Sequence, residues 1–435
     1  MTSLTHTPAA QHYRDAFEQL RPGLRGSAAR RSAALDRFME LGFPQAPDEA
    51  WKYTNLRRLE SRRFAPATPG AATTTRAHLP PGLVPQRIVV ENGYVRADLP
   101  NVEAAAAAGF RMTTLAVGTA DERLSEAVLR CLTGGGTDGF AALNAALAPD
   151  PVLLECTGSG DGVLQVSLLS TGATATLASP RLVVRMGAGR RGRLLLDYTD
   201  DGTVERFVNS VLDVELADGA ELTVYRAQRH GDRTFHIDRL DANVANDARF
   251  VCRDSQLGGS LARLDLNVTL RGRAAQAQLT GVFLADGTRH LDTHVRVDHY
   301  GVATASLQDY RGIAANRGRA VFNGKAVVQP GAQKSNARQS SRNLLLTPGA
   351  EIDTKPELEI YADDVQCSHG ATTGQLDPNA LFYLRSRGLS EPEARSALTR
   401  AFAGAVLTLV DIAPLAALVH DELERRLVGL LEVAA

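Results

Sequence analysis

The sequence is poor in aromatic residues and has no long apolar segment. Phe, Trp and Tyr make up 5% of its 435 residues, and tryptophan occurs once, at Trp51. No stretch approaches the roughly 20 apolar residues that a membrane-spanning helix needs. The first residues also lack the basic stretch and apolar run that are typical of a secretory signal. We therefore expect a cytoplasmic protein with no membrane partner.

Cysteine and surplus charge are scarce as well. Cys131, Cys156, Cys252 and Cys367 are scattered and include no Cys-x-x-Cys pair, which disfavours a disulfide framework and a self-contained zinc site. We expect the first three to be buried as small apolar side chains. The formal net charge is −1, from 48 basic and 49 acidic residues, so the charge gives no indication of a nucleic-acid partner.

Hydrophobic periodicity divides the chain into three regions. Residues 1–150 are predicted to be helical or mixed, with a linker rich in Ala, Thr, Pro and Gly near residues 62–85. Residues 151–371 contain short runs rich in Val, Leu, Thr and Tyr, separated by Gly, Asp and Asn, which predicts strands. Residues 372–435 return to a helical pattern and are predicted to form a small helical domain.

Within the first region, residues 104–109 and 124–132 are expected to be helical. The glycines at 134–136 follow the second of these stretches. They lack the Gly-Lys-Ser/Thr sequence of a phosphate-binding loop, so we interpret them as a flexible turn. No Walker motif occurs elsewhere in the sequence, which disfavours ATP hydrolysis by this chain.

The central region contains a loose repeat, in which a turn of small residues precedes an alanine. Its first four intervals measure 28, 26, 29 and 29 residues and its last measures 18, between Ala220, Ala248, Ala274, Ala303, Ala332 and Ala350. Nearly equal intervals indicate coils stacked along one axis, as in a parallel β-helix. Chance recurrence of common residues is the alternative explanation, and a β-sandwich is the rival architecture.

The C-terminal region carries clear helix signals. Asp377 can cap a helix that begins at Pro378, and Ser390 with Glu393 forms a capping-box pattern before a second helix. Helical spacing predicts one apolar face on this second helix, made of Ala394, Ala397, Leu398, Ala401, Phe402, Ala405 and Val406. That face could pack on the β core of this chain or dock a partner.

Cys367 and His369 are the strongest candidate site. If they continue a strand, the period of two places both side chains on one face and Ser368 on the other. A thiolate beside an imidazole is a plausible ligand set for iron or a cluster, but two ligands cannot complete a site. A packed or solvent-facing pair is the alternative. No nucleophile elbow surrounds Ser368, which disfavours hydrolase chemistry.

A second candidate lies in the sequence RHLDTHVRVDH. On a strand, His290, Asp292 and His294 would share one face, which suits a metal site. Ordinary hydrogen bonding on the surface of a strand explains the same pattern. Both interpretations stay open at this stage.

Two segments resemble the SufB/SufD family of iron–sulfur cluster assembly scaffolds, and its SufD branch in particular. One is EAWKYTNL at residues 49–56, and the other runs from Arg319 through YADDVQCSHGAT to Leu389. The resemblance implies a mainly β protein with a right-handed parallel β-helix core, a helical N-terminal region and a small C-terminal helical domain. A SufB-type chain is the close alternative, because both branches share much of the motif.

The resemblance also implies a function and partners. We expect a non-enzymatic scaffold with no catalytic residue and no permanent cofactor, which pairs with a SufB-like paralogue and docks a SufC-like ABC ATPase. It could also form a homodimer in isolation. A transient iron–sulfur cluster could be shared with a partner near His369 and Cys367, and the residues predicted to bind partners are Phe382, Tyr383, Arg385, Ala401 and Phe402. A carbohydrate-active β-helix enzyme and a pure interaction module are the alternatives from other functional classes.

Overall fold

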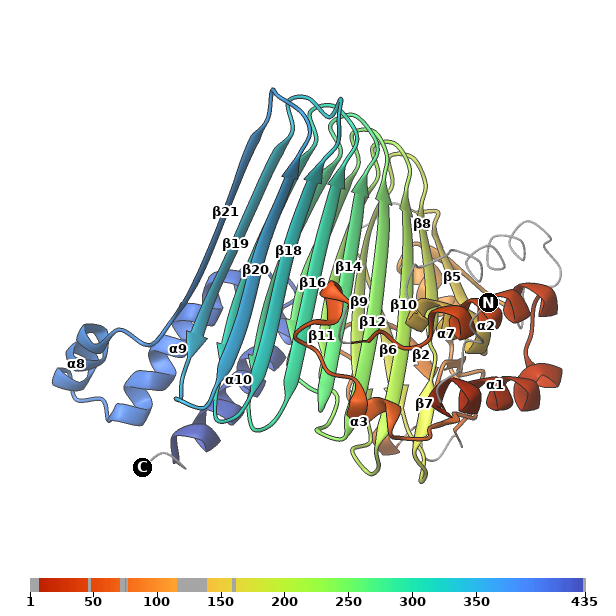
Figure 1. The fold of residues 1–435 in the computed structure, drawn as a ribbon, viewed down its shortest axis with the longest axis horizontal. Coiled ribbons are helices and arrows are strands. Elements are labelled where there is room, and N and C mark those ends of the chain that lie inside the picture. Colours follow the sequence, from red (N-terminus) through yellow and green to blue (C-terminus); the bar gives the residue numbers. More distant parts are fainter. Residues whose placement is uncertain are drawn as a thin grey trace.

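The chain folds as a parallel β-solenoid of about seven coils, with helices at both ends (Figure 1). This computed structural model describes residues 8–45, 48–70, 75, 77–115, 139–158 and 162–432, with side chains up to residue 426. The mainly β class and the solenoid predicted from the sequence are confirmed, and so are the flanking helices. The predicted helix at 124–132, the glycines at 134–136 and Cys131 lie outside the described residues.

Each coil contributes one strand to each of two sheets. Along sheet A the order is β20 (Glu351–Ile360), β18 (Arg319–Val328), β16 (His290–His299), β14 (Leu261–Leu270), β12 (Thr234–Val244), β10 (Arg206–Leu216), β8 (Arg181–Met186), β5 (Val152–Cys156) and β4 (Phe110–Thr114). The short strands β1 (Ala65–Pro66) and β7 (Thr176–Ala178) pair beside β10. All of these pairs are parallel except β4 with β5.

Sheet B faces sheet A across the core. Its order is β21 (Gln366–Gly374), β19 (Asn336–Leu345), β17 (Ala305–Ala314), β15 (Gln276–Ala285), β13 (Arg249–Gln256), β11 (Glu221–Gln228), β9 (Arg191–Asp200), β6 (Val163–Ser170), β2 (Gln86–Glu91) and β3 (Tyr94–Val95). Strands β2 and β4 both precede residue 151, so the solenoid begins within the region that the sequence indicated as helical or mixed.

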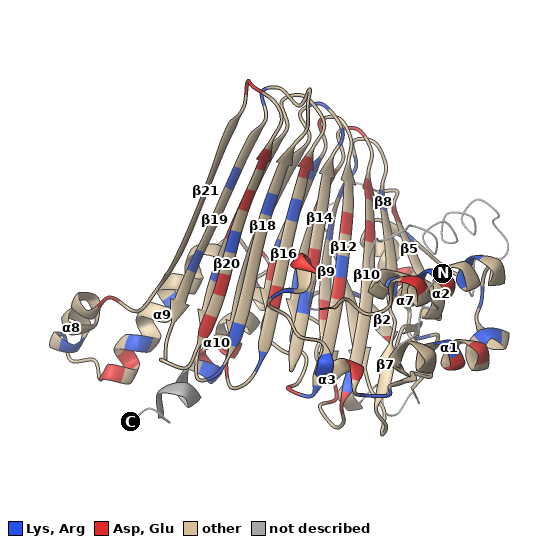
Figure 2. Ribbon diagram, viewed as in Figure 1, with Lys and Arg blue, Asp and Glu red and all other residues tan. Residues whose placement is uncertain are grey.

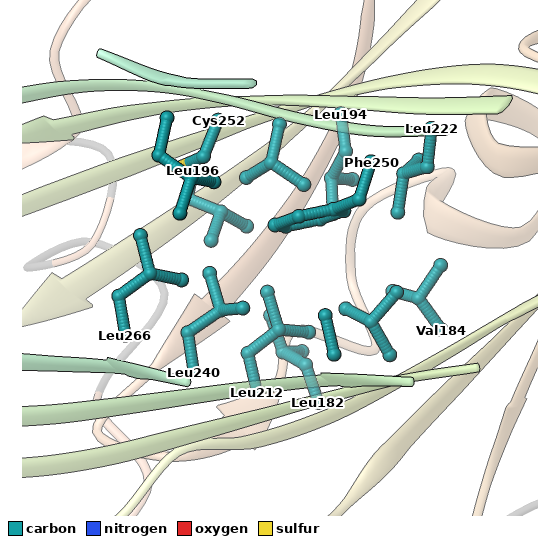
Figure 3. Close-up of a cluster of buried hydrophobic side chains, with 14 of the residues drawn as sticks. Leu182, Val184, Leu194, Leu196, Leu212, Leu222, Leu240, Phe250, Cys252 and Leu266 are labelled. Atoms are coloured by element: carbon teal, nitrogen blue, oxygen red, sulfur yellow. The ribbon is translucent and has the colours of Figure 1, made fainter. Parts of the chain in front are cut away.

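Stacked aliphatic side chains fill the space between the sheets. In β10, Leu212 and Val214 point inward and are buried, whereas Asp213 lies between them on the outer face, as the period of two requires. Leu212 stands in register with Leu182 of the preceding coil and Leu240 of the following one. Figure 3 shows such leucines of sheet A facing Phe250, Leu222 and Cys252 of sheet B. Each coil therefore covers the apolar edge of the next.

The predicted repeat corresponds to a left-handed backbone position that recurs two residues before the strands of sheet B. It is occupied, with φ between 53° and 67°, by Gly189, Gly219, Asp247, Ala274, Ala303 and Lys334. These residues are spaced by 30, 28, 27, 29 and 31 residues. The period is confirmed, but the alanine register was wrong in detail: Ala220 and Ala248 come one residue later than this position, and Ala350 precedes β20 in sheet A.

The N-terminal helices pack on the outer face of sheet A at the first coils. They are α1 (Pro8–Leu20), η1 (Arg21–Gly23), α2 (Ala28–Leu41), η2 (Glu49–Trp51), α3 (Arg57–Glu60) and α7 (Gly139–Leu147), while α5 (Asn101–Ala107) contacts β2 and β4. An aromatic cluster joins them to the sheet, in which Phe140 contacts Phe43, Trp51 and Phe207. This cluster contains nine of the 23 Phe, Tyr and Trp residues of the protein, so aromatic packing fixes the N-terminal helices to the sheet.

The C-terminal helices are α8 (Pro378–Ser386), α9 (Glu391–Leu407) and α10 (Ala413–Glu432). The predicted cap at Asp377 and the capping box of Ser390 and Glu393 are both formed. Apolar residues of α9 and α10, including Val406 and Val419, pack on the outer face of sheet B. Among the described residues, no helix is long and apolar enough to cross a membrane.

The apolar face predicted for α9 was partly wrong. Ala401 is exposed, whereas Ala403 and Leu407 are buried. Alanine occurs on two opposite sides of this helix, at Ala401 and at Ala403, and its small side chain gives little indication of which side is covered. The bulkier Val406 and Leu407, together with the sheet beneath them, determine the buried face.

Candidate functional site at the open end of the solenoid

The C-terminal end of the solenoid is open, because β20 and β21 are the last strands of their sheets. Within the described residues each has one neighbouring strand, β18 or β19, and its other edge is unpaired. Unpaired strand edges are ready to add a further strand. The end of the solenoid thus presents backbone hydrogen-bonding groups as well as side chains.

Cys367 and His369 lie on β21, on the face that continues the interior of the solenoid. Their register partners on β19 are Ala337 and Gln339, which are both buried. Ser368 points the other way, so the predicted sharing of one face by Cys367 and His369 is confirmed. His369 is exposed and Cys367 is half-buried, because no further coil covers them.

The environment of Cys367 keeps the thiol protonated. The side chain packs against Val328, Ala332 and Ala362. Burial raises its pKa above the ordinary value, although the backbone of Ala337 has an opposing effect. A thiolate at neutral pH therefore needs a metal or another positive charge nearby, because the thiolate is the form that binds metal.

Cys367 and His369 do not complete a metal site by themselves. Among the described residues, no group of three or more His, Cys, Asp or Glu side chains could hold a metal ion. On the opposite wall, Ile352, Thr354 and Leu358 of β20 continue the interior columns of Ala320, Phe322 and Ala326, and they supply no strong metal ligand. The open end thus holds a thiol and an imidazole beside an apolar wall, and within the described residues these two side chains do not complete a metal site.

His290, Asp292 and His294 share the outer face of β16, as predicted, but they contact the protein itself. The Thr54 hydroxyl donates to Asp292 Oδ2 at 2.6 Å and lies 2.8 Å from His290 Nε2. Arg263 donates to the same carboxylate oxygen at 2.7 Å, and His294 Nε2 lies 3.0 Å from Oδ1. Surface hydrogen bonding, the alternative left open by the sequence, accounts for the pattern.

These contacts fasten an N-terminal segment to sheet A, and we call residues 49–56 the strap. The Arg263 guanidinium lies 3.8 Å from the centre of the Trp51 ring and donates to the carbonyl of Ala50 at 2.7 Å. Burial would raise the pKa of Asp292, but Arg263, His294 and Thr54 outweigh it and hold that pKa well below its ordinary value. The carboxylate is therefore ionised at neutral pH and links the strap to the sheet. Arg263 was not singled out from the sequence, although its alternation with Asp265 was visible there.

Helix α8 projects from the body of the protein, and none of its residues is buried. Phe382 is 75% exposed and Tyr383 is 56% exposed. Such exposure of large side chains is typical of an interaction site. Arg385 is exposed and lies 3.5 Å from Glu391, whereas Phe402 of α9 is half-buried beneath Arg311. Partner binding by these residues stays a prediction.

Comparison with known proteins agrees with this architecture. The family described as SUF system FeS cluster assembly, SufBD core domain, matches residues 168–402. An iron–sulfur cluster assembly SufBD family protein of Synechocystis is 32% identical over 89% of this chain and 88% of its own length. Escherichia coli SufD is 26% identical over 85% and 86%, and a SufBD family protein of Mycobacterium tuberculosis is 27% identical over 88% and 89%. The chain therefore belongs to the SufB/SufD family of iron–sulfur cluster assembly proteins, and it is SufD-like.

Proposed function

We propose that this chain is a cytoplasmic, non-enzymatic scaffold subunit that pairs with a SufB-like paralogue through the open end of its solenoid. The proposal rests on one observation: β20 and β21 each have an edge without a neighbouring strand, and Cys367 and His369 lie at that end of the solenoid. A paralogue with the same fold would offer matching edges, so that strand pairing could continue from one solenoid into the other.

In this proposal a nascent iron–sulfur cluster is transient cargo. It forms at the junction of the two solenoids, where His369 and Cys367 supply part of its ligand set. The paralogue supplies the rest, because these two side chains cannot enclose iron alone. The protonated state of the Cys367 thiol in the isolated chain fits a site that is activated on assembly. In isolation, the same edges could pair two copies of this chain.

We further propose that a SufC-like ATPase docks on α8 and the adjoining part of α9. The exposed Phe382 and Tyr383 provide apolar anchors, and Arg385 and Ala401 provide exposed surface beside them. Residues 375–377 alone separate β21 from α8. Movement of α8 would therefore pull directly on β21, so that nucleotide-driven closure of two ATPase subunits would rearrange the junction.

The deciding experiment is reconstitution of the complex from this chain, its paralogue and the ATPase encoded in the same genome. His369→Ala should leave the three proteins co-purifying in the same ratio but lower the yield of assembled cluster, followed by absorbance under anaerobic conditions. Ser368→Ala, on the opposite face of β21, is the matched control and should retain the wild-type yield. A wild-type yield from His369→Ala would remove His369 from the mechanism, and failure of this chain to co-purify with the paralogue would refute the pairing.

A further inference from the structure

The outer face of sheet B carries a group of arginines that we call the basic face. It consists of Arg191 and Arg193 on β9, Arg249 and Arg253 on β13, and Arg338 and Arg342 on β19. All six point outward, because residues that alternate with them, including Leu194, Cys252 and Ala337, are buried in the core. Strand pairing places Arg191 in one row with Arg249, and Arg193 in one row with Arg338, along the axis of the solenoid, whereas Arg253 and Arg342 lie further along their strands.

Few carboxylates balance these arginines. Glu221 lies between Arg191 and Arg249, at 3.9 Å from each, and Asp411 pairs with Arg193 at 2.6 Å. Asp309 occupies the outer face of β17. Six guanidinium groups against three carboxylates leave a local charge of about +3 on a chain whose net charge is −1.

Arg253, in the middle of the basic face, and Arg338, near the open end, make their side-chain hydrogen bonds to neutral groups. Arg253 donates to the neutral Thr280 hydroxyl at 2.9 Å, and Arg338 donates to the neutral Asn336 side chain at 3.2 Å. Burial lowers the pKa of Arg253, and Arg249 contributes in the same direction. In the part of the chain that the structure describes, neither Arg338 nor Arg342 has a carboxylate within ion-pairing distance.

The outer face of sheet A provides an internal comparison. Its charges pair with one another across and along the strands, as in Arg185 with Glu215 at 2.9 Å and Arg296 with Asp298 at 2.7 Å. Figure 2 accordingly shows acidic and basic bands interspersed over β10 to β20, whereas β19 carries basic bands without an acidic one. The sequence of β21 contains no Asp, Glu, Lys or Arg to balance them. The imbalance is therefore specific to sheet B.

We propose that the basic face binds an acidic segment of a partner protein, independently of whether the open end pairs as suggested above. The planar guanidinium group of arginine can donate two parallel hydrogen bonds to one carboxylate group. From β9 to β19 the face spans five strand spacings, about 24 Å at ~4.8 Å each, which matches a helix of about 16 residues. Glu221, Asp309 and Asp411 interrupt the basic face, so a continuous phosphate backbone would meet repulsion there, whereas a peptide can place its carboxylates between them.

Fluorescence anisotropy with a labelled peptide of about 16 residues, built from a repeated Glu-Glu-Ala-Ala unit, tests the proposal on the full chain. We expect saturable binding that weakens as salt is added. The double variant Arg338→Glu, Arg342→Glu should weaken it by about tenfold or more. Arg249→Glu, in the middle of the basic face, provides a second variant should the first fail to fold, as judged by circular dichroism.

The matched control is Arg21→Glu, Arg37→Glu, which makes the same change of charge on exposed residues of the N-terminal helices. It should bind the peptide like the wild type. Equal weakening in this control would show a response to net charge alone and would overturn the proposal. So would the absence of saturable binding, or tighter binding of a labelled oligothymidylate of equal length, which would indicate a nucleic-acid surface instead.

Discussion

Thr54 donates a 2.6 Å hydrogen bond to Asp292 across 238 residues of sequence. The contact joins the strap, which follows α2 in the sequence, to the outer face of β16. Both side chains are buried, and the carboxylate also pairs with Arg263. The N-terminal region is therefore tied to the later coils of the solenoid as well as to the first ones.

Replacing Thr54 with Val should destabilise the protein, because it leaves the buried Asp292 without one of its donors. The loss of a hydrogen bond to a buried charged group predicts a decrease of about 1–3 kcal/mol in the free energy of unfolding. Urea denaturation would measure it. Tyr53→Phe, at the neighbouring exposed position, should change stability by less than about 0.5 kcal/mol; equal effects of the two substitutions would contradict the proposed role of the contact.

His299 should make the fold sensitive to acid. Its ring nitrogens lie 2.8 Å from the hydroxyls of Thr304 and Ser306, and burial lowers its pKa to about 4, although the charge of Asp298 acts in the opposite direction. Between its ordinary pKa of 6.5 and about 4, the unfolded chain binds the proton and the folded chain does not. Stability is thus complete above pH 6.5 and falls as the pH drops towards 4.

For this single residue the expected loss between pH 7 and pH 5 is about 2 kcal/mol. Urea denaturation of the wild type and His299→Gln at both pH values isolates it, because the other buried histidines, such as His230, titrate in both proteins. The difference in stability between the two proteins should shrink on acidification. A difference that stays constant would show that His299 takes up a proton in the folded chain as readily as in the unfolded chain.

The left-handed turn positions predict an unusual stabilising substitution. Ala303 is exposed and has a φ of 59°, a conformation in which any Cβ is strained. Ala303→Gly should therefore raise the free energy of unfolding by up to about 1 kcal/mol, despite the greater entropy of glycine in the unfolded chain. Ala303→Val should lower it, because β-branched residues fit this conformation worst. If valine were tolerated as well as glycine, the turn would have to relax in solution.

Helix α8 can be tested separately from the open end. Phe382→Asp combined with Tyr383→Asp should abolish co-purification of the SufC-like ATPase and leave the paralogue bound, because the two proposed surfaces do not overlap. Val102→Asp, at a residue that is 52% exposed on α5, is the control and should retain both partners. Retention of the ATPase by the α8 variant would place its docking surface elsewhere.

The sequence predicted the solenoid because strand alternation and turn residues are local properties. Runs such as that containing Leu212 and Val214 identify strands, and the turns between them set the period. The register was harder to predict, because Asp247 and Lys334 adopt a left-handed conformation that sequence patterns usually assign to glycine.

The period of two in a strand predicted that Cys367 and His369 share one face. It could not predict the contacts that distant parts of the chain make with each other. The anchor formed by Thr54, Asp292 and Arg263 depends on contacts between residues more than 200 positions apart, which no local pattern contains. The basic face was not predicted from the sequence either. Its arginines are separated in sequence by up to about 150 residues and are interspersed with acidic residues that fold onto the other sheet.

Because the coils stack, the length of the solenoid can change only by whole coils. Each coil adds about 4.8 Å along the axis, and contacts chiefly its two neighbours. Duplication or deletion of the coil from Gly219 to Asp247 would move β14 and β16 by one fixed step relative to the N-terminal helices and would break the contacts of the strap. The strap thus fixes the number of coils that can lie between the N-terminal helices and β16, as a ruler of set length would.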